Sequence, residues 1–483
     1  MAEIILVQPE VGDMDSVRSA PSIPASLLHA ATLVSREFDV KLIDQRLDKM
    51  WKKSLAKELA KKPLCVGVTA MTGMQIKHAL EISRFVKEKK GDANVPVIWG
   101  GVHASLLPEQ TLKNKFIDIV VKGEGEESFL ELARALKDNK PLEGIHGVWY
   151  KKNNKICGNT DRAFLDLDKL PDIPYHLVNV SDYLQLYDNR KSLAIQTSRG
   201  CPNQCTYCYN VVYNKRRWRG LSSGTVIERI KLAVKEFGVE DVYLLDDNFF
   251  IDMKRAKAIA QGLKRLGITW QAQGVTVESI DVMSNDYLKL LEQSGLRRVT
   301  LGIESGSPRI RRLIGKNDDV DKIIRVNKRL RGQNIIVFCS FITGFPTETR
   351  EDLQKTISLI FSLLKDNPNM RNSPVYNFIP YPGTKMAELA KKHGFKEPVS
   401  LEQWADFAYS NSNVPYIGSI ASKKELESLY FSSIFIDDKF REYTSSGLIR
   451  ILARLYRPFA RFRVRNLFFK FMIEEKIKRL IAG

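Results

Sequence analysis

The sequence predicts an α/β protein with two domains of parallel strands and a helical C-terminal region. Three observations support this fold class. Strand and helix signals alternate over residues 1–150, the alternation resumes over residues 191–390, and helical patterns fill most of residues 391–483. Short apolar runs separated by helices of about ten or more residues are typical of βαβ crossovers.

Residues 1–150 predict a doubly wound, Rossmann-like parallel sheet. The expected strands are residues 4–7, 40–43, 65–69, 95–99 and 117–121, and the expected helices are residues 26–35, 51–60, 76–88 and 126–136. Such sheets bind ligands at the carboxyl ends of their strands. Polar, small or glycine-rich segments lie at those ends, at residues 8–9, 69–73, 100–103 and 123–126. We therefore expect a binding crevice there, although a single glycine can also serve only to turn the chain. An NAD site is not expected, because VQPE at residues 7–10 lacks the GxGxxG motif.

Residues 151–190 are predicted to be a linker with one hairpin at most, because they combine turn residues with little periodicity. Strand signals return at residues 193–197, 242–245, 269–272, 298–303, 335–343 and 374–379. Six strand–helix repeats predict a full or partial barrel of parallel strands. In such barrels the chemistry lies on the loops that follow the strands.

The strongest chemical signal is the segment CPNQCTYC at residues 201–208, directly after the first barrel strand. Its cysteines, Cys201, Cys205 and Cys208, have the spacing CxxxCxxC, and three thiolates on one loop can each bind one iron of a 4Fe–4S cluster. No fourth cysteine lies nearby in the sequence. Three ligands leave one iron open for another ligand, whereas a structural zinc site normally takes four. The sequence therefore predicts a catalytic iron–sulfur site.

The composition restricts the class of protein. Six cysteines are too few for a disulfide framework, and no apolar stretch reaches the length of a membrane span. The N-terminal residues do not have the pattern of a signal peptide, so we expect a cytoplasmic protein.

The formal net charge is +19, and residues 450–479 hold ten basic residues against two acidic ones. This tail alternates arginine with Leu, Phe and Tyr. Three interpretations stay open: packing on the barrel with arginines that extend to water, contact with a membrane or a macromolecular substrate, or binding of nucleic acid. No specific nucleic-acid partner is expected.

The three-cysteine motif and its place after the first barrel strand resemble the radical S-adenosylmethionine (SAM) superfamily. Four further segments resemble motifs of that family: LDDNF at residues 245–249, GIESG at 302–306, GFPTET at 344–349 and YPGT at 381–384. The third departs from the usual GxPGET, because Thr347 stands where glycine is common. The resemblance implies a partial (β/α)6, TIM-like barrel. It also implies that SAM contacts Tyr207, Asp246, Asp247, Asn248, Gly302, Glu304 and Ser305.

Residues 1–150 resemble the cobalamin-binding domain that precedes the barrel in class B radical SAM methyltransferases. The residues that the resemblance assigns to cobalamin are Gln8, Pro9, Thr69, Met71, Thr72, Gly73, Gly100, Gly101, His103, Gly123, Glu124, Gly125 and Glu126. None of the six histidines lies in the cobalt-ligating motif DxHxxG. The resemblance therefore implies cobalt without a lower histidine ligand. For His103 we favour loop packing or a hydrogen bond to the cofactor edge over direct ligation.

The resemblance implies methylation of an unactivated sp3 carbon. A 5′-deoxyadenosyl radical would abstract the hydrogen atom, methylcobalamin would donate the methyl group, and ferredoxin or flavodoxin would supply electrons. The substrate would be a protein side chain, a tetrapyrrole, a lipid or another large or anionic molecule. Tyr376 and Tyr381 are candidates for the substrate cavity or for packing. The alternatives are an oxidative cyclase or rearrangement enzyme that acts on a tetrapyrrole or lipid, and a cobalamin-binding sensor.

Overall fold

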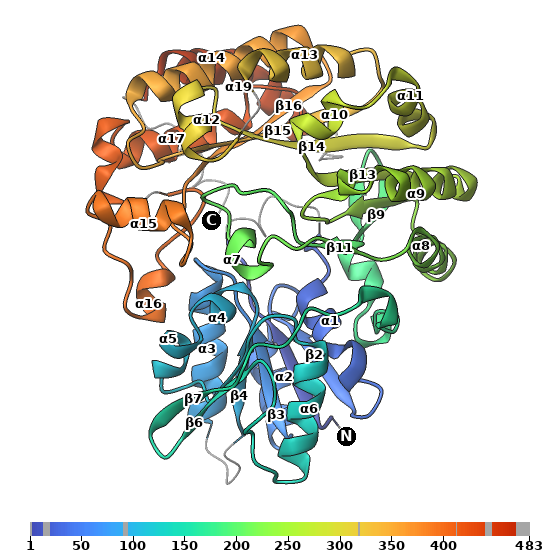
Figure 1. Ribbon diagram of the computed structural model, residues 1–483, viewed down its shortest axis with the longest axis vertical. Coiled ribbons are helices and arrows are strands. Elements are labelled where there is room, and N and C mark those ends of the chain that lie inside the picture. Colours follow the sequence, from blue (N-terminus) through green and yellow to red (C-terminus); the bar gives the residue numbers. More distant parts are fainter. Residues whose placement is uncertain are drawn as a thin grey trace. The chain divides into compact units, whose positions relative to one another are not determined.

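A computed structural model describes residues 2–12, 20–89, 95–316, 319–411, 413–439 and 447–469 (Figure 1). The chain forms two compact units. The first contains Met1–Leu184 and Glu397–Phe407, and the second contains Gln185–Lys396 and Ala408–Gly483. Residues 470–483, the end of the basic tail, lie outside the described residues.

The first unit has a seven-stranded sheet with the order β2-β1-β3-β4-β5-β6-β7. The strands are β1 (Ile4–Gln8), β2 (Val40–Asp44), β3 (Cys65–Thr69), β4 (Val97–Gly100), β5 (Ile119–Val121), β6 (Val148–Lys152) and β7 (Lys155–Gly158). Strands β1 to β5 are parallel, and the β6–β7 hairpin adds antiparallel strands at one edge. The order 2-1-3-4-5 is that of flavodoxin-like doubly wound sheets, not of the dinucleotide-binding fold.

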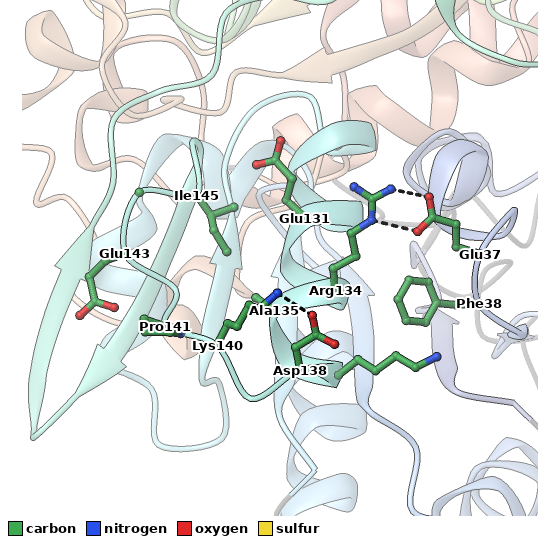
Figure 2. Close-up of a pocket in the computed structure, with 12 residues that line it drawn as sticks. Glu37, Phe38, Glu131, Arg134, Ala135, Asp138, Lys140, Pro141, Glu143 and Ile145 are labelled. Carbon is green, nitrogen blue, oxygen red and sulfur yellow. Dashed lines mark hydrogen bonds and ion pairs between the residues drawn. The ribbon is translucent and has the colours of Figure 1, made fainter.

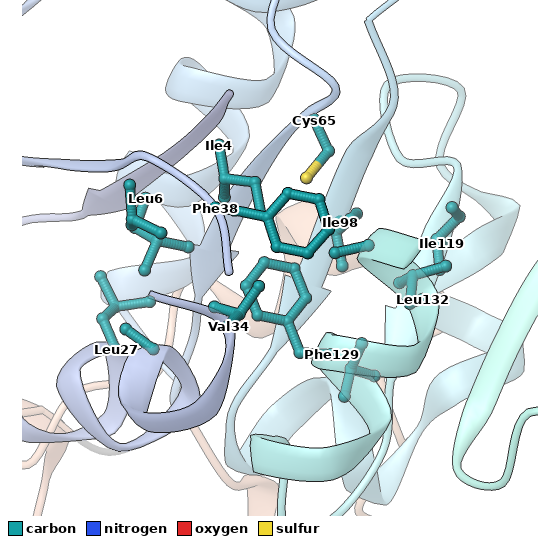
Figure 3. Packing of buried hydrophobic residues seen from close by; sticks show 14 of the residues in the cluster. Ile4, Leu6, Leu27, Val34, Phe38, Cys65, Ile98, Ile119, Phe129 and Leu132 are labelled. Atoms are coloured by element: carbon teal, nitrogen blue, oxygen red, sulfur yellow. The ribbon is translucent and has the colours of Figure 1, made fainter. Parts of the chain in front are cut away.

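Helices cover both faces of this sheet. They are α1 (Ala25–Val34), α2 (Trp51–Leu59), α3 (Gln75–Glu88), α4 (Val102–Leu106), α5 (Pro108–Lys113) and α6 (Glu126–Lys137). On one face α1 and α6 pack together over a core that includes Leu6, Leu27 and Phe129 (Figure 3). Strands β1 and β3 are buried along their whole length, which is why they read in the sequence as unbroken apolar runs.

The second unit has a seven-stranded sheet with the order β16-β15-β14-β13-β12-β9-β8. Its strands are β8 (Gln185–Tyr187), β9 (Arg190–Ile195), β12 (Asp241–Leu244), β13 (Thr269–Val275), β14 (Leu296–Glu304), β15 (Ile336–Thr343) and β16 (Met370–Asn377). The six strands from β9 to β16 run parallel, and β8 pairs antiparallel with β9. No pairing among the described residues joins β16 to β8, so the predicted barrel is a partial one.

The helices of the second unit follow its strands. They are α7 (Asn210–Tyr213), α8 (Ser223–Phe237), α9 (Met253–Leu266), α10 (Val277–Asp281), α11 (Asn285–Gln293), α12 (Pro308–Leu313), α13 (Val320–Leu330), α14 (Arg350–Asp366), α15 (Lys385–Lys392), α17 (Lys423–Ile434) and α19 (Gly447–Asn466). Their ends follow local chemistry. Asp252, for example, begins α9 by accepting a hydrogen bond from the Arg255 amide at 2.9 Å, and Gly238 and Gly267 end α8 and α9 in the left-handed conformation.

The boundaries of the two units differ at two segments from the domain boundaries predicted from the sequence. Residues up to Leu184 cluster with the first unit, so the unit boundary lies inside the segment predicted as a linker. Residues Glu397–Phe407, which include α16 (Leu401–Trp404), also cluster with the first unit, although they follow α15 in the chain.

Candidate functional site

The cysteine loop lies at the carboxyl end of the half-barrel, directly after β9. A short pairing of β10 (Ser198–Arg199) with β11 (Arg219–Gly220) closes its base. The Thr206 amide donates to the Ile314 carbonyl at 3.0 Å, and the Met386 amide donates to the Thr206 carbonyl at 2.9 Å. The loop is therefore held between the end of α12 and the start of α15.

The three cysteines are half-buried and form no disulfide. Among the described residues, no three His, Cys, Asp or Glu side chains lie close enough to bind one metal ion. This does not conflict with a cubane cluster, because its cysteines each bind a different iron and therefore stand further apart. Burial raises the pKa of Cys205 and raises that of Cys208 to about 12. Such thiols become thiolates when a cation compensates the charge, so this donor set fits an iron cluster.

Asp246 ties β12 to the segment that leads into the cysteine loop. Its buried carboxylate accepts hydrogen bonds from the amide and hydroxyl of Thr197, at 2.7 and 2.6 Å, and from those of Ser198, at 3.0 and 2.6 Å. Four hydrogen bonds fill the acceptor positions of a carboxylate. Asp246 therefore positions the loop, and its contact with SAM stays a prediction.

Asp247 and Asn248 face the start of the cysteine loop. Asp247 accepts a hydrogen bond from the Gly200 amide at 2.7 Å, and the Asn248 side-chain amide lies 3.5 Å from the Cys201 sulfur. Asn248 is buried, and its side-chain oxygen has no hydrogen-bond partner. A buried acceptor without a partner is costly. Its place beside Cys201 fits a ligand that donates hydrogen bonds, such as the ammonium group of SAM.

Glu304 ends β14 with a φ of +69°, an unusual conformation for a residue with a side chain. It is buried, accepts a hydrogen bond from the Ser340 hydroxyl at 3.0 Å and lies 3.9 Å from the Lys316 ammonium. Lys316 also donates to the Gly302 carbonyl at 2.7 Å. Ser305 is fully buried and contacts the Thr356 hydroxyl at 3.2 Å. Glu304 is thus held in a strained backbone by polar contacts, which is common at functional sites. The Ser305 hydroxyl has partners inside the protein, and its contact with SAM stays a prediction.

Tyrosines surround the cysteine loop. Tyr207 packs edge-on against Phe345, with ring centroids 5.7 Å apart, and burial raises its pKa well above the usual value. Tyr381 is buried, its ring lies tilted against the Tyr209 ring, and its hydroxyl shares a hydrogen bond of 2.7 Å with the Tyr409 hydroxyl. Tyr376, in turn, packs against the Tyr409 ring. Both sequence candidates, Tyr376 and Tyr381, therefore belong to one aromatic cluster that extends to the residue after Cys208.

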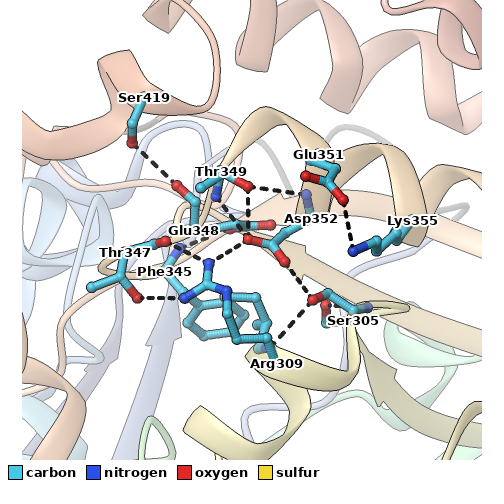
Figure 4. Close-up of polar contacts among 12 residues, drawn as sticks. Ser305, Arg309, Phe345, Thr347, Glu348, Thr349, Glu351, Asp352, Lys355 and Ser419 are labelled. Atoms are coloured by element: carbon cyan, nitrogen blue, oxygen red, sulfur yellow. Dashed lines mark hydrogen bonds and ion pairs between the residues drawn. The ribbon is translucent and has the colours of Figure 1, made fainter.

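Thr347 shows why glycine is common at its position. Its φ is +66°, a conformation that is costly for a β-branched residue. In Figure 4 Arg309 lies against this turn, donating to the Thr347 hydroxyl at 3.1 Å and to its carbonyl at 2.6 Å. Asp352 fixes the same turn as part of the capping box of α14.

We expect Thr347→Gly to be more stable than Thr347→Ala by about 1 kcal/mol, because both variants lose the hydroxyl contact and only glycine relieves the strain, which exceeds the entropy that glycine loses. Thr347→Ala keeps the strain and loses the hydroxyl contact, so it should destabilise by about 0.5–1 kcal/mol. Urea denaturation of the two variants checks this. A Thr347→Gly variant that is less stable than Thr347→Ala would contradict it.

In the first unit, the thirteen predicted cobalamin residues lie at or just after the carboxyl ends of β1, β3, β4 and β5. The loops after β3 and β4 are joined directly, because the His103 amide donates to the Ala70 carbonyl at 3.1 Å. Gly101 has a φ of +89°, and a Cβ there would lie 2.7 Å from the Thr69 hydroxyl, so only glycine fits. Gly123 has open space where a Cβ would point, which suits close approach of a ligand.

The other predicted residues of this edge have differing surroundings. Gln8 ends β1, and its side chain donates to the Pro9 carbonyl at 2.9 Å; Met71 is exposed. Glu124 is buried and accepts from the Leu165 amide at 2.9 Å, and Glu126 is buried in the first turn of α6. These two glutamates therefore have structural environments, and their role in binding cobalamin stays a prediction. Of the remaining glycines, Gly73 turns its loop with a φ of +113°, Gly100 ends β4 and Gly125 precedes α6.

His103 is completely buried, and Trp404 covers it. The Nδ1 atom of His103 lies 3.1 Å from the Thr72 hydroxyl, and its Nε2 atom has no hydrogen-bond partner. The Trp404 ring packs edge-on at 5.7 Å, and its Nε1 atom donates to Gln110 at 2.9 Å. Trp404 could not be predicted at this edge, because no local pattern shows that residues 397–407 return to the first unit. The unpartnered nitrogen fits a ligand group at this edge.

Burial lowers the pKa of His103 to about 3. The unfolded chain binds a proton below about pH 6.5, whereas the folded chain resists it, so stability falls as the pH drops below that value. We expect a loss of about 2 kcal/mol between pH 7 and pH 5 in the wild type, and a smaller loss in His103→Gln. Denaturation at both pH values checks this. The control His146→Gln should keep the wild-type dependence because His146 is exposed, and an unchanged dependence in His103→Gln would contradict the assignment.

A surface hollow of about 570 Å³ lies elsewhere on the first unit (Figure 2). Its lining includes Glu37, Phe38 and Arg134, and Arg134 forms an ion pair with Glu37. Its lining residues lie just before the start of β2 and at the end of α6. These positions are at the amino ends of the parallel strands. The hollow is therefore on the side of the sheet opposite the candidate site.

Comparisons with known proteins agree with the candidate site of each unit. The sequence matches the family models of the radical SAM superfamily, over residues 195–360, and of the B12 binding domain, over residues 19–133. It is 33% identical over 395 residues to "Uncharacterized methyltransferase PH0819" of Pyrococcus horikoshii, an alignment that covers 81% of this chain and 83% of that protein. It is 27% identical over 331 residues to the anaerobic magnesium-protoporphyrin IX monomethyl ester cyclase of Rubrivivax gelatinosus, over 66% of this chain and 57% of the relative.

Among solved structures, the radical SAM methyltransferase TsrM from Kitasatospora setae, with cobalamin and a 4Fe–4S cluster bound, superposes with a TM-score of 0.65. The two chains are 20% identical, and the match covers 81% of this chain and 78% of the other, so the fold is shared. The predicted domain types and fold are confirmed. The chain belongs to the family of cobalamin-dependent radical SAM methyltransferases, whose cofactors are a 4Fe–4S cluster, SAM and cobalamin.

Proposed function

We propose that this enzyme methylates an unactivated sp3 carbon. One observation carries the proposal. Cys201, Asn248 and Glu304 all lie at the carboxyl edge of the half-barrel, where they follow or end β9, β12 and β14. These three strands belong to one parallel sheet. An open iron site and a polar SAM pocket at one edge are the parts that hydrogen abstraction requires. When bound, the reduced cluster supplies the electron that cleaves SAM, and methylcobalamin supplies the methyl group.

The chain itself positions these cofactors. Cys201, Cys205 and Cys208 would hold the cluster, and the loop that carries them is fixed by Asp246. The unpartnered oxygen of Asn248 would accept a hydrogen bond from the SAM ammonium group. Lys316, 3.9 Å from Glu304, would offset the negative charge of that carboxylate beside the cluster.

The first unit would hold cobalamin at the carboxyl edge of its sheet. The glycines of its loops let the backbone approach a flat macrocycle. The buried, neutral ring of His103 would donate or accept one hydrogen bond at the cofactor edge through its unpartnered Nε2 atom. Its cover by Trp404 and its contact with Thr72 support this role over cobalt ligation.

A second candidate function is oxidative cyclisation of a tetrapyrrole or lipid. The observation that favours it is the relation to the magnesium-protoporphyrin ester cyclase. That relative matches less of the chain and with lower identity than the methyltransferase of Pyrococcus horikoshii, so methylation has the stronger support.

The partners follow from the same chemistry. The net charge of +19 and the aromatic cluster around Tyr381 favour a large or anionic substrate, such as a protein side chain, a tetrapyrrole or a lipid. Reduction of the cluster would require a one-electron donor such as ferredoxin or flavodoxin. A reducing cytoplasm suits a site that depends on three free cysteines.

The test uses SAM with a deuterated methyl group. The anaerobically reconstituted enzyme is incubated with this SAM, a reductant and separate protein, lipid and small-molecule fractions of a cell extract. We expect the intact deuterated methyl group on an sp3 carbon that is otherwise bound only to carbon and hydrogen, and label on an sp2 carbon would contradict the proposal. Label on nitrogen, oxygen or sulfur would contradict the proposal. A product that has lost hydrogen and carries no label would replace it with cyclisation.

A further inference from the structure

The helix α19 presents six large apolar side chains to solvent along one stripe. They are Leu448, Ile451, Leu452, Leu455, Phe459 and Phe462, and their exposed fractions run from 38% at Phe459 to 72% at Leu455. The spacing of three and four residues places all six on one face of the helix. The stripe extends over about 21 Å at 1.5 Å per residue. We call this surface the α19 stripe.

The opposite side of α19 is already occupied. The helix packs against α14 and α17, and Ala453, Ala460 and Val464 are buried on that side. Arg457 forms an ion pair with Asp438, and the Arg465 guanidinium lies 4.6 Å from the centroid of the Phe361 ring. The helix is therefore anchored to the second unit with its apolar stripe outward. Of the three interpretations of the tail, packing therefore describes one side of α19.

Charge indicates what covers the α19 stripe. The helix contains six arginines and no acidic residue, and Arg450, Arg454 and Arg465 are exposed. At 100° per residue Arg465 and Arg454 lie about 40° and 60° beyond one edge of the stripe, and Arg450 lies about 100° beyond the same edge. An amphipathic helix with a basic flank and an aliphatic and aromatic face is the pattern of a helix that lies in the surface of an anionic bilayer. No described helix is long and apolar enough to cross a membrane.

We propose that α19 docks the enzyme on an anionic membrane surface, with the α19 stripe in the acyl boundary and the flanking arginines at the phosphate groups. A second copy of the chain fits this surface less well, because two α19 helices would bring together like charges with no acidic residue to compensate. Nucleic acid would pair with the arginines, yet four of the six stripe residues are aliphatic and give no surface for base stacking. The stripe is a convex helix face, and a flat lipid surface accommodates it along its length.

The test is co-sedimentation of the full-length holoenzyme with vesicles of phosphatidylcholine alone or mixed with phosphatidylglycerol. The stripe variant is Leu452→Glu with Leu455→Glu. The matched control is Val282→Glu with Val399→Glu, because Val282 and Val399 are 75% and 74% exposed and lie outside α19. Both double variants add two negative charges at exposed apolar positions. General repulsion between the protein and the anionic vesicles therefore affects both variants alike.

We expect binding to the anionic vesicles, weaker binding at high salt, and a fall of about tenfold or more in partitioning for the stripe variant but not for the control. Equal binding by the stripe variant and the wild type would overturn the proposal, as would the absence of binding to anionic vesicles. A dimer in light scattering that the stripe variant abolishes, without vesicle binding, would assign the stripe to a second copy instead. Binding of an oligonucleotide without vesicle binding would assign the arginines to nucleic acid.

Discussion

Replacement of Gly200 by alanine is expected to abolish cluster binding. Gly200 directly precedes Cys201 and has a φ of +85°, and a Cβ there would lie 1.8 Å from the Arg217 carbonyl oxygen. That overlap cannot be relieved by rotating a side chain, because the obstacle is backbone. Overpacking of this kind costs about 3 kcal/mol or more, so the loop must move and the fraction of chain that binds iron should fall by tenfold or more. Iron and sulfide analysis after anaerobic reconstitution measures the effect.

The control for this variant is Gly238→Ala. Gly238 ends α8 with a φ of +63°, and no atom lies within 4 Å of its would-be Cβ. The control therefore carries the left-handed strain, about 1 kcal/mol, without the collision. It should bind iron as the wild type does. Normal iron content in Gly200→Ala would show that the cysteine loop is not fixed as described.

The second large effect concerns Asp246→Ala. This change leaves four buried donors of Thr197 and Ser198 without an acceptor, so the free energy of unfolding of the second unit should fall by about 3–5 kcal/mol. Because those donors lead into the cysteine loop, the folded fraction should also lose SAM cleavage. Denaturation and an assay for 5′-deoxyadenosine measure the two effects separately.

The same strand offers a matched control for Asp246. Asp241 is also buried, at the other end of β12, and accepts hydrogen bonds from Ser192 at 2.6 Å and from Gln271 at 2.6 Å. Burial raises the pKa of both aspartates. Asp241→Ala should cost similar stability but leave the chemistry of the folded enzyme intact. Equal loss of activity in both variants at low temperature would contradict the positioning role of Asp246.

Much of the fold could be predicted because parallel strands buried on both faces read as apolar runs. Strands β1, β3 and β15 lie within a residue of their predicted bounds. Whether the barrel closes could not be predicted, because closure depends on pairing between the first and last strands. The hairpin expected in residues 151–190 begins before that segment, because β6 and β7 span residues 148–158. Its pairing with the first sheet could not be predicted, because its polar residues give little periodicity.

Some residues of the candidate site could likewise be predicted from the sequence, and others could not. The cysteines carry their chemistry in their spacing, so the sequence alone predicts them. Thr347 is an anomaly that the sequence also shows, and its left-handed backbone gives the physical reason. The role of Asp246 depends on the register that places β12 beside the end of β9, and the cover of His103 by Trp404 joins residues about 300 positions apart. Contacts of that range leave no local pattern.

The most direct test of the central claim is the fate of SAM. The enzyme is reconstituted anaerobically with iron, sulfide and cobalamin, and SAM and a strong reductant are added before mass spectrometry. We expect both 5′-deoxyadenosine and S-adenosylhomocysteine from the wild type, and no 5′-deoxyadenosine from Cys208→Ala. If the wild type bound cobalamin yet formed neither product, the three-cysteine loop would not be the catalytic iron–sulfur site described here.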